Sequence, residues 1–483
     1  MTSLRSSPAS TAAWSFALLG FGLATVTHAD PDLWGHVRFG LDALATHSLP
    51  VTDRYSFTQD RAWLNHEWLS EVVMAAAYEA LGTLGLRLLK AGMVICTFAL
   101  IWRSYRGTAW PAKLVAVAWL VFGAVHMIAT VRPQLWSLLF TLAIARQLVA
   151  PSRHAYWELP VSFALWANLH GGWIVGLGIV GLWVVFGGIV VAGKRMQTWA
   201  MAGACVLATL ATPYGVRLWT FVWETVQFER AITEWRPLWE GASGGEWTAW
   251  IGTVSLSLWT VRASRARDLA RMAVLLLLAV LAFRVMRIGS LFAAVAVVFA
   301  STWVRRAWPA RAADDRPRVA AAVAGALAVV PLGLAAVGAI RITTATSCIV
   351  STGPWAADPV AIEVLSSAPP GVLVTAFDWG QYAIWHLGPR IRVSVDGRRE
   401  TIYSQDHLKR HDEVVMGTDS GLTALEGWQP DYVWLPSDAR NTRRWLEAHG
   451  YVIAVDTPRS FVAAKTPLSA GNRALGGPRC FPD

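Results

Sequence analysis

Two aspartates separated by one residue follow the first apolar segment, in the sequence Asp30-Pro31-Asp32. Such a pair could supply a general base and an orienting carboxylate, or could hold a divalent cation (Mg²⁺ or Mn²⁺) shared with a phosphate. The alternative is an ordinary helix start, where aspartate is favoured. The composition of the whole stretch from His28 to Trp68 favours a chemical role for its ionisable residues. A chain with mean hydropathy +0.40 and 15% charged residues rarely gathers ionisable groups beside a membrane span.

Other side chains suited to substrate binding lie in this stretch and at the ends of later apolar runs. His36, His66 and Glu67 could bind a phosphate or an acceptor hydroxyl, although a lone His-Glu pair is equally typical of an interface. Arginines at outer span ends oppose the positive-inside tendency, and a phosphate is their natural partner. These arginines are Arg132, Arg284 and Arg287. For any one of them, snorkelling to lipid headgroups is an equal alternative.

Motifs shaped by glycine add three more candidates. His170, in Asn168-Leu-His170-Gly-Gly172, stands at a helix end that could face a site or form a plain turn. Asp396 and Arg398, in Val395-Asp-Gly-Arg398, follow a predicted strand, where sites in α/β domains often lie. A tight turn at Asp396-Gly397 is equally typical.

Metal-ligand and disulfide patterns are weak in this chain. The histidines have the residue type of zinc ligands but not their spacing, so zinc is not expected. Four cysteines offer no disulfide framework. Of these, Cys348 and Cys480 could pair with each other outside the cell.

Membrane helices must position these residues. The 54% hydrophobic content is spread over repeated apolar runs, and a backbone in lipid must satisfy its own hydrogen bonds, so we expect a polytopic α-helical membrane protein. The run from about Ala12 to Thr27 is a first span or a cleaved signal peptide. Further spans, which bring the total to about 11 transmembrane helices, are predicted at Leu84–Trp102, Ala112–Thr130, Leu135–Val149, Leu159–Leu169, Trp173–Val191, Thr198–Thr212, Thr248–Val261, Leu269–Phe283, Ile288–Val304 and Val319–Ile340.

Basic residues support this count, because alternate loops carry arginine and lysine clusters, as cytoplasmic loops do. The pattern requires that His66–Gly82 lies along the outer surface as an amphipathic helix. The protein is then expected in a bacterial cytoplasmic (inner) membrane, with the amino terminus inside and the carboxyl-terminal domain outside. Basic loops also account for the net charge of +10, so nucleic-acid binding is rejected.

The sequence pattern changes after Arg341 to short β-rich runs at Gly371–Thr375, Ile391–Val395, Asp431–Leu435 and Tyr451–Val455, with an amphipathic stretch at Ala439–His449. We therefore expect two domains. Residues 1–340 form a transmembrane domain, whose outer-face loop at 28–82 carries surface helices. Residues 341–483 form a small α/β extracytoplasmic domain.

The order of these features resembles the GT-C superfamily of membrane glycosyltransferases. A first span, an outer loop opening with Asp30-Pro-Asp32, surface helices and a glycine-rich span start all recur there. The resemblance is closest to its polyprenyl-phosphate-sugar-dependent branch, which includes protein mannosyltransferases and the aminoarabinose transferases acting on lipid A. Two motifs depart from that branch. His66-Glu67-Trp68 stands where a basic residue and proline are usual, and Arg132-Pro133 stands where an acid is usual.

A more specific resemblance covers most of the chain. It rests on Asp-Pro-Asp-Leu-Trp, Asn-His-Glu-Trp-Leu, Arg-Pro-Gln, Asn-Leu-His-Gly-Gly and the Val-Asp-Gly-Arg of the tail. Together these motifs are similar to a subgroup of uncharacterised bacterial membrane proteins near the GT-C superfamily. This likeness names no substrate.

The resemblance implies an inverting transfer of a hexosyl or pentosyl group on the outer face of the membrane. The sugar would move from a lipid-linked phosphate donor to a hydroxyl or amine of an envelope acceptor. Asp32 would be the base, Asp30 would orient the acceptor or hold a cation, and the three outer arginines would bind the donor phosphate. The lipid phosphate is a good leaving group, so a metal is not required.

Two other classes of function stay open from the sequence. One is a non-catalytic membrane protein of envelope assembly, whose tail binds an envelope protein partner. The other is a transporter. A pore would need polar residues at mid-depth of several helices, where this chain has Ala, Val, Leu and Trp.

Overall fold

The computed structural model describes residues 27–190, 195–228, 233–263, 268–307, 309, 348–351, 353, 355–468 and 480–483. The predicted last span, and all of the first except Thr27, lie outside these residues. The chain forms two compact units. The first comprises 1–27, 84–219 and 230–346, and the second comprises 28–83, 220–229 and 347–483. Contacts therefore place the loop at 28–83 in the same unit as the tail, whereas the domains predicted from the sequence place it with the spans.

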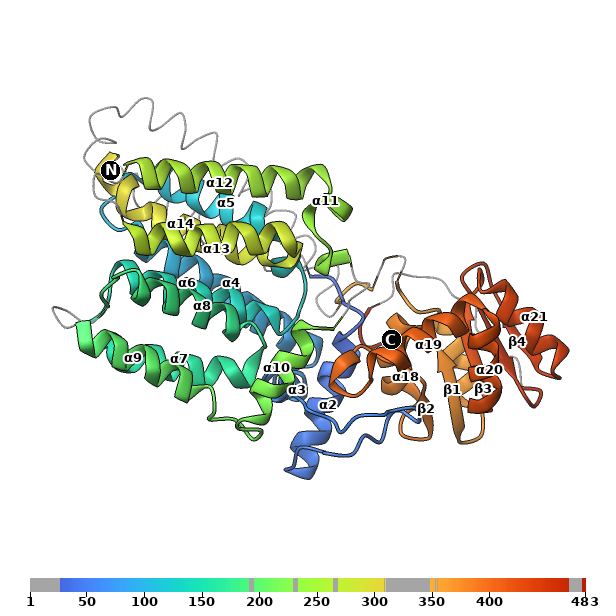
Figure 1. Ribbon diagram of the computed structural model, residues 1–483. Helices are drawn as coiled ribbons and strands as arrows, with labels where there is room; N and C mark the ends of the chain where they lie inside the picture. Colours follow the sequence, from blue (N-terminus) through green and yellow to red (C-terminus); the bar gives the residue numbers. More distant parts are fainter. Residues whose placement is uncertain are drawn as a thin grey trace, which may run out of the picture. The chain divides into compact units, whose positions relative to one another are not determined.

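The described part of the first unit is helical (Figure 1). Its elements are α4 (Thr83–Ser104), α5 (Trp110–Ala129), α6 (Gln134–Val149), α7 (Ala155–Leu169), α8 (Trp173–Val185), α9 (Arg195–Ala208), the start of α10 (Arg217–Val226), η1 (Thr233–Trp235), α11 (Leu238–Gly241), α12 (Gly244–Ala263), α13 (Leu269–Arg284), η2 (Met286–Ile288) and α14 (Gly289–Ala307).

Each predicted span within the described residues coincides with a helix. Among the residues that the structure describes, three helical segments are long and apolar enough to cross a membrane, and they run over Thr83–Ser104, Trp110–Ala129 and Met286–Ala307. Helices α6 and α8 are apolar but shorter, and α8 ends at Val185, before the predicted end at Val191. The total of about 11 spans stays a prediction.

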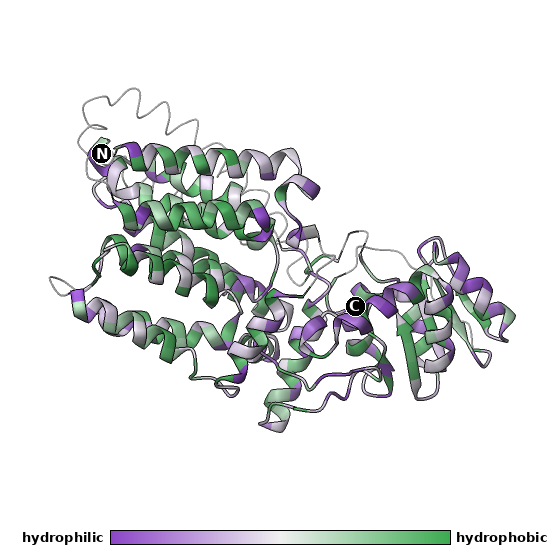
Figure 2. Cartoon of the chain, in the orientation of Figure 1, coloured by the Kyte–Doolittle hydropathy of each residue, from purple (hydrophilic) through white to green (hydrophobic). Residues whose placement is uncertain are grey.

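Apolar side chains on the outside of this unit mark it as a membrane protein. Leu88 and Ile95 of α4 and Leu276 of α13 are more than half exposed, and Figure 2 shows hydrophobic residues along the helices of this unit. In water such a surface would be unfavourable, whereas acyl chains solvate it. Helix α14 lies in the interior of the unit, because Phe292 and Phe299 are fully buried.

The second unit combines two helices of the outer loop with the tail domain. Its elements are α2 (Leu33–Thr46), α3 (Trp68–Leu81), α17 (Pro359–Ser366), β1 (Gly371–Thr375), η3 (Phe377–Trp379), α18 (Gly380–Leu387), β2 (Ile391–Val393), η4 (Arg399–Thr401), α19 (Gln405–Met416), α20 (Asp419–Trp428), β3 (Tyr432–Pro436), α21 (Arg440–Ala448), β4 (Val452–Asp456) and β5 (Ser460–Ala464). Helix α3 covers 14 residues of the segment His66–Gly82, whose location along the membrane surface stays a prediction.

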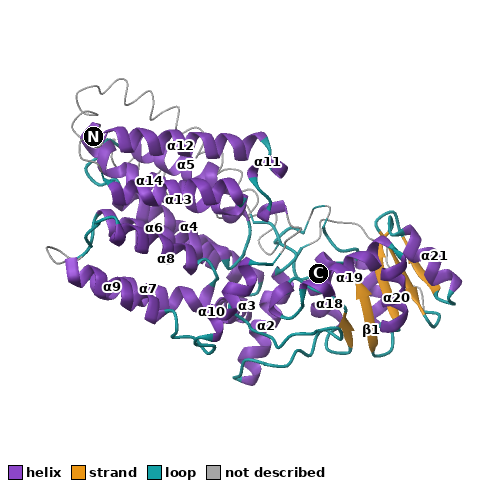
Figure 3. Cartoon of the chain, in the orientation of Figure 1, coloured by secondary structure: helices purple, strands orange, loops and turns teal. Residues whose placement is uncertain are grey.

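The strands form one five-stranded mixed sheet in the order β2-β1-β3-β5-β4, and they belong to the second unit (Figure 3). Strand β1 pairs in parallel with β2 and β3, and β5 pairs antiparallel with β3 and β4. The predicted α/β tail domain is therefore confirmed as a fold. Its core holds Val374, Val433, Leu435 and Phe461, all fully buried.

The outer loop extends this sheet. Ser56 forms a parallel bridge with Val393 of β2, the Val393 N–H donates to Tyr55 O at 2.9 Å, and the Phe57 N–H donates to Val393 O at 3.1 Å. An unpaired edge strand exposes a row of backbone groups, and residues 55–57 cover this edge at β2. This pairing explains why the loop and the tail form one unit.

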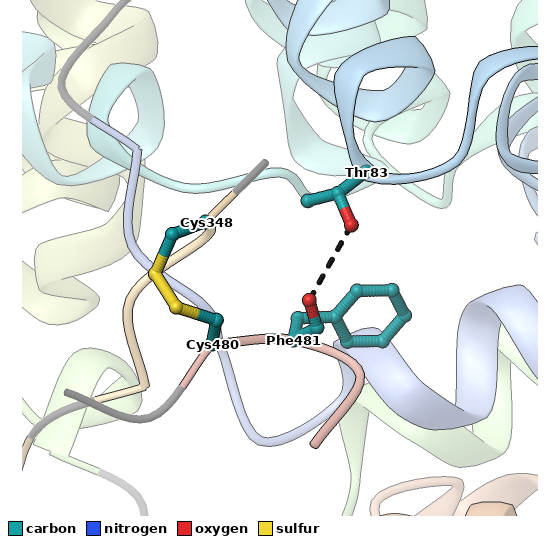
Figure 4. The surroundings of a disulfide bond; sticks show 4 residues. All are labelled: Thr83, Cys348, Cys480 and Phe481. Carbon is teal, nitrogen blue, oxygen red and sulfur yellow. Dashed lines mark hydrogen bonds between the residues drawn. A yellow bond between two sulfur atoms is a disulfide. The ribbon is translucent and has the colours of Figure 1, made fainter. Parts of the chain in front are cut away.

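The carboxyl-terminal residues close the second unit. A disulfide joins Cys348 to Cys480, and Thr83 Oγ1 donates to Phe481 O at 3.4 Å (Figure 4). The Phe481 ring is buried among aromatic rings, at 5.4 Å from Trp34 and 5.5 Å from Trp385. The predicted pairing of the two cysteines is confirmed.

Candidate active site

Asp30 and Asp32 precede α2 and have different environments. Asp30 is buried, and its Oδ1 accepts the backbone N–H of Asp32 at 3.0 Å. Asp32 occupies the position before Leu33, but in the described structure its side chain makes no capping hydrogen bond to α2. The helix-start interpretation therefore does not account for the Asp32 carboxylate. Asp30 instead has a local structural role, because its carboxylate accepts a backbone hydrogen bond just before the helix begins.

The Asp32 carboxylate lies against the turn that follows β2. A methyl group built on Gly397 would stand 1.8 Å from Asp32 Oδ1, which is far inside van der Waals contact. The turn can approach the carboxylate this closely only because residue 397 has no side chain. Two motifs singled out in the sequence, Asp-Pro-Asp and Val-Asp-Gly-Arg, thus meet in the second unit.

His36 follows Asp32 by one helical turn and belongs to a buried polar chain. Its Nδ1 lies 3.2 Å from Glu71 Oε1, and Asn65 Nδ2 donates to Glu71 Oε2 at 2.5 Å. Burial lowers the pKa of His36, but the hydrogen bond to Glu71 and the charges of Glu67, Glu71 and Asp32 outweigh it, raising the pKa from 6.5 to about 9. At neutral pH His36 is therefore an imidazolium among carboxylates.

His66 and Glu67 lie at the start of α3, beside this chain. His66 Nε2 is 3.6 Å from Glu67 Oε1, and the centre of the His66 ring lies 5.1 Å from that of the Phe221 ring, at a tilt. Both side chains are partly accessible, with 22% and 18% of their surface exposed. Their predicted role in substrate binding stays a prediction.

Asp396 and Arg398 form a closed ion network with Asp53. Arg398 Nη1 donates to Asp53 Oδ1 at 2.6 Å and Nη2 to Asp396 Oδ2 at 2.7 Å, and both carboxylates are completely buried. The carboxylates raise the pKa of Arg398 well above its ordinary value, despite burial. The contacts found here are structural ones that hold the turn beside Asp32. Direct binding of substrate by these two residues stays a prediction.

The three arginines predicted at outer span ends lie in the first unit, and each contacts a residue between Glu234 and Trp239. Arg132 Nη1 is 3.2 Å from Glu234 Oε1. The guanidinium carbon of Arg284 lies 5.7 Å from the centre of the Trp239 ring, and that of Arg287 lies 5.5 Å from the centre of the Trp235 ring. The sequence Glu234-Trp-Arg-Pro-Leu-Trp239 thus gathers all three cations. The predicted role of these arginines in binding the donor phosphate stays a prediction.

His170 joins this arginine cluster through one contact. Its Nε2 lies 3.5 Å from Arg287 Nη2, while its Nδ1 lies 2.6 Å from Ser137 Oγ. Trp166 Nε1 donates to the same Ser137 oxygen at 2.8 Å. Packing thus fixes the imidazole beside a guanidinium, where a phosphate oxygen could be bound by both.

Sequence reasoning missed two buried cations in α4, Arg87 and Lys90. Lys90 is fully buried, and its Nζ donates to Thr27 Oγ1 at 2.9 Å and to Ala129 O at 3.4 Å. The signal was present, because ionisable residues inside an apolar span are costly and usually functional. Glu71 was also missed, although its spacing of four from Glu67 places both on one helix face.

The candidate residues divide between the two units. Asp30, Asp32, His36, His66, Glu67, Asp396 and Arg398 belong to the second unit, and Arg132, His170, Arg284 and Arg287 belong to the first. In the second unit Asp32 lies beside Gly397, and in the first unit His170 lies beside Arg287. A single site that includes residues of both stays a prediction. Among the described residues, no group of three or more His, Cys, Asp and Glu side chains could hold a metal ion.

The chain thus combines a helical bundle with a small α/β domain and carries an aspartate pair in the loop at 28–82, and its fold is GT-C-like. A search of solved structures supports this class. The chain is similar to ArnT from Cupriavidus metallidurans, in a crystal structure bound to undecaprenyl phosphate, with a TM-score of 0.56 and 12% identity. The match covers 95% of this chain and 98% of ArnT. No family model and no curated protein sequence matches the chain.

Proposed function

We propose that the protein is a membrane glycosyltransferase that moves a sugar from a polyprenyl-phosphate donor to an envelope acceptor. The observation that carries the proposal is the Asp32 carboxylate, held at the start of α2 against Gly397, in a fold shared with ArnT along nearly its whole length. The ArnT structure contains undecaprenyl phosphate, which is a polyprenyl phosphate. The reaction would take place on the outer face of the cytoplasmic membrane.

The proposed reaction is a single displacement with inversion. Asp32 accepts the proton of an acceptor hydroxyl or amine as that atom attacks the anomeric carbon of the sugar. The bond from this carbon to the phosphate oxygen breaks, and its electron pair leaves with the polyprenyl phosphate. Because the leaving group is a stable phosphate, the step needs no metal. If a divalent cation takes part, Asp30 and Asp32 would hold it.

The donor phosphate needs cations, and the first unit offers them. Arg132, Arg284 and Arg287 each contact the segment 234–239, and Lys90 is a buried lysine of α4. Guanidinium groups bind phosphate oxygens bidentately, and the tryptophan rings beside Arg284 and Arg287 attract these cations. The arginine cluster is therefore suited to hold the phosphate of a lipid-linked donor.

The test is turnover by the purified full-length protein in detergent or nanodiscs, supplied with a polyprenyl-phosphate sugar and an envelope acceptor extract. Asp32→Asn keeps the size of the side chain but removes the base, so it should lower kcat by roughly a hundredfold or more. Undecaprenyl phosphate should still bind to this variant. Unchanged turnover would show that Asp32 is not the base.

A non-catalytic role in envelope assembly predicts a different result. A binding protein would retain undecaprenyl phosphate but release no polyprenyl phosphate from any sugar donor. Transport would move the intact donor across a vesicle without cleaving it. Transfer of a radiolabelled sugar from the donor to the acceptor, with release of polyprenyl phosphate, therefore separates the three functions.

A further inference from the structure

The inference concerns Gln381, the second residue of α18 in the tail domain. Its side chain is 3% exposed and lies between two glycines from distant parts of the sequence. A methyl group on Gly35 of α2 would stand 2.1 Å from Gln381 Oε1, and one on Gly397 would stand 2.8 Å from Gln381 Nε2. The amide thus extends from α2 to the turn after β2.

This place brings Gln381 near the Asp32 carboxylate, beside Gly397. The point that a methyl group on Gly397 would occupy lies 1.8 Å from Asp32 Oδ1 and 2.8 Å from Gln381 Nε2. Both atoms therefore border the space that Gly397 leaves open. All these residues belong to the second unit.

The tail turn that carries Gly397 is itself rigidly held. Asp396 and Arg398, on either side of Gly397, are fixed by the buried ion network with Asp53. Helix α18 begins against the same turn, because a methyl group on Gly380 would stand 2.1 Å from Val395 O. A rigid surface from the tail domain therefore faces Asp32, as is required to hold a reacting group within a fraction of an ångström.

We propose that Gln381 is a positioning residue for Asp32, and that the tail domain thereby completes the catalytic centre. This inference rests on the proposed function. A side-chain amide is well suited to position a catalytic carboxylate. A neutral N–H group can orient a carboxylate without pairing with it as an ion, so Asp32 keeps its ability to accept a proton. A lysine or arginine at this place would make Asp32 a weaker base.

Positioning also explains why two glycines border one glutamine. Each glycine removes the methyl group that would otherwise separate α2, the amide and the turn. Misplacement of a catalytic group by about 1 Å can lower a rate by roughly a hundredfold. If Gln381 only filled space, an apolar side chain of equal size would serve as well.

The experiment measures kcat, KM and the pH profile of sugar transfer for three variants of the full-length protein. Gln381→Leu keeps the volume and removes the amide, so it should lower kcat by roughly a hundredfold at nearly constant KM. Gln381→Glu adds a like charge beside Asp32 and should move the acidic limb of the kcat/KM profile up by about one pH unit. Gly397→Ala should lower kcat because its methyl group must displace Asp32.

The matched control is Gly427→Ala in α20, where an added methyl group meets no atom within 4 Å. It should keep wild-type kinetics. Thermal unfolding and undecaprenyl phosphate binding, measured on each variant, report whether the fold is retained. If Gly397→Ala unfolds, the two Gln381 variants decide the question, because a purely structural change would not move the pH profile.

Each outcome has a distinct meaning. Loss of kcat in Gln381→Leu together with the pH shift in Gln381→Glu supports the inference. Wild-type kcat and an unmoved profile in both variants, with Asp32→Asn inactive, would overturn it while leaving the proposed function intact. An active Asp32→Asn protein would instead overturn the proposed function.

Discussion

The imidazole of His36 and the carboxylate of Glu71 form a buried pair, with 3.2 Å between Nδ1 and Oε1 and with 12% and 6% of their side chains exposed. The pair joins α2, which carries Asp32 at its start, to α3. Because the pKa of His36 is raised from 6.5 to about 9, the folded state binds its proton more tightly than the unfolded chain does. This linkage makes the stability of the second unit depend on pH.

The first prediction follows from the sign of that shift. The stability that His36 contributes is fully present below about pH 6.5 and is lost as the pH rises through about 9. We expect His36→Gln to destabilise the protein by about 3 kcal/mol near pH 6, and by much less near pH 10. Thermal unfolding of the purified protein at both pH values measures the difference.

The matched control for this prediction is His47→Gln. His47 ends the same helix and is exposed, so its replacement should have a small effect at either pH. A destabilisation by His36→Gln that is equal at both pH values would show that the Glu71 pair does not bind the proton.

The second prediction concerns the Arg398 network. Replacement of Arg398 by methionine leaves the completely buried carboxylates of Asp53 and Asp396 without their cation. Breaking a buried ion network in this way costs about 3–5 kcal/mol, so the melting temperature of the second unit should fall. The triple variant with Asp53→Asn and Asp396→Asn should recover part of that loss, because it removes the buried charges. Arg444→Met, at an exposed arginine of α21, is the control and should melt like the wild type.

Elements that depend on local pattern could be predicted from the sequence. Strand β1 coincides with the predicted run, and the ranges of β3 and β4 are displaced by one residue from theirs. Strand β5 was not predicted, because Ser460–Ala464 is rich in small residues. It is a strand because β3 and β4 pair with it on both sides, which is information that the segment itself does not contain.

The candidate site also contains residues that could be selected from the sequence and residues whose role depends on tertiary contacts. Asp32 and the three outer arginines could be selected because their residue types are unusual where they stand. The contact of Asp32 with Gly397, and the approach of Gln381, join residues more than 340 positions apart in the sequence. No local pattern marks such a pair, and a glutamine at the start of a helix attracts no attention on its own. Tertiary packing gives these residues their relation to the aspartate.

The third prediction tests the donor-binding role of the arginine cluster. Arg132→Gln and Arg287→Gln each remove a cation that is expected to bind the phosphate. Charge-assisted hydrogen bonds contribute about 1.5–3 kcal/mol, so the KM for the polyprenyl-phosphate sugar should rise by roughly tenfold to a hundredfold. The effect should weaken at high salt, since ions screen the attraction.

Arg106→Gln serves as the control for the arginine variants. Arg106 is exposed near the end of α4 that the loop charges place in the cytoplasm, so its replacement should leave KM unchanged. If Arg132→Gln and Arg287→Gln also keep the wild-type KM, the cluster does not hold the donor.

The last prediction concerns the disulfide between Cys348 and Cys480, which are 132 positions apart. It fixes the carboxyl-terminal residues, whose Pro482 O accepts the Trp34 N–H at 2.9 Å and whose Phe481 ring packs on Trp34, near the start of α2. Removing a disulfide that closes a long loop costs about 2–5 kcal/mol, so Cys348→Ser with Cys480→Ser should lower the melting temperature. Reductant should produce the same fall in the wild type and none in the double variant. Cys96→Ser, at a free cysteine of α4, should melt like the wild type.

The same disulfide tests on which side of the membrane the tail lies. Disulfides persist outside the cytoplasm and are rare inside it, so the predicted outer location requires that Cys348 and Cys480 are oxidised in growing cells. Alkylation of whole cells before and after reduction, followed by mass spectrometry, should find these two thiols protected until reductant is added. Cys96 should be alkylated without reduction in detergent-solubilised protein, because it is free and exposed. Tail thiols that react without reductant would place the tail on the inner side, and Asp32 with it, since the outer loop and the tail share one compact unit.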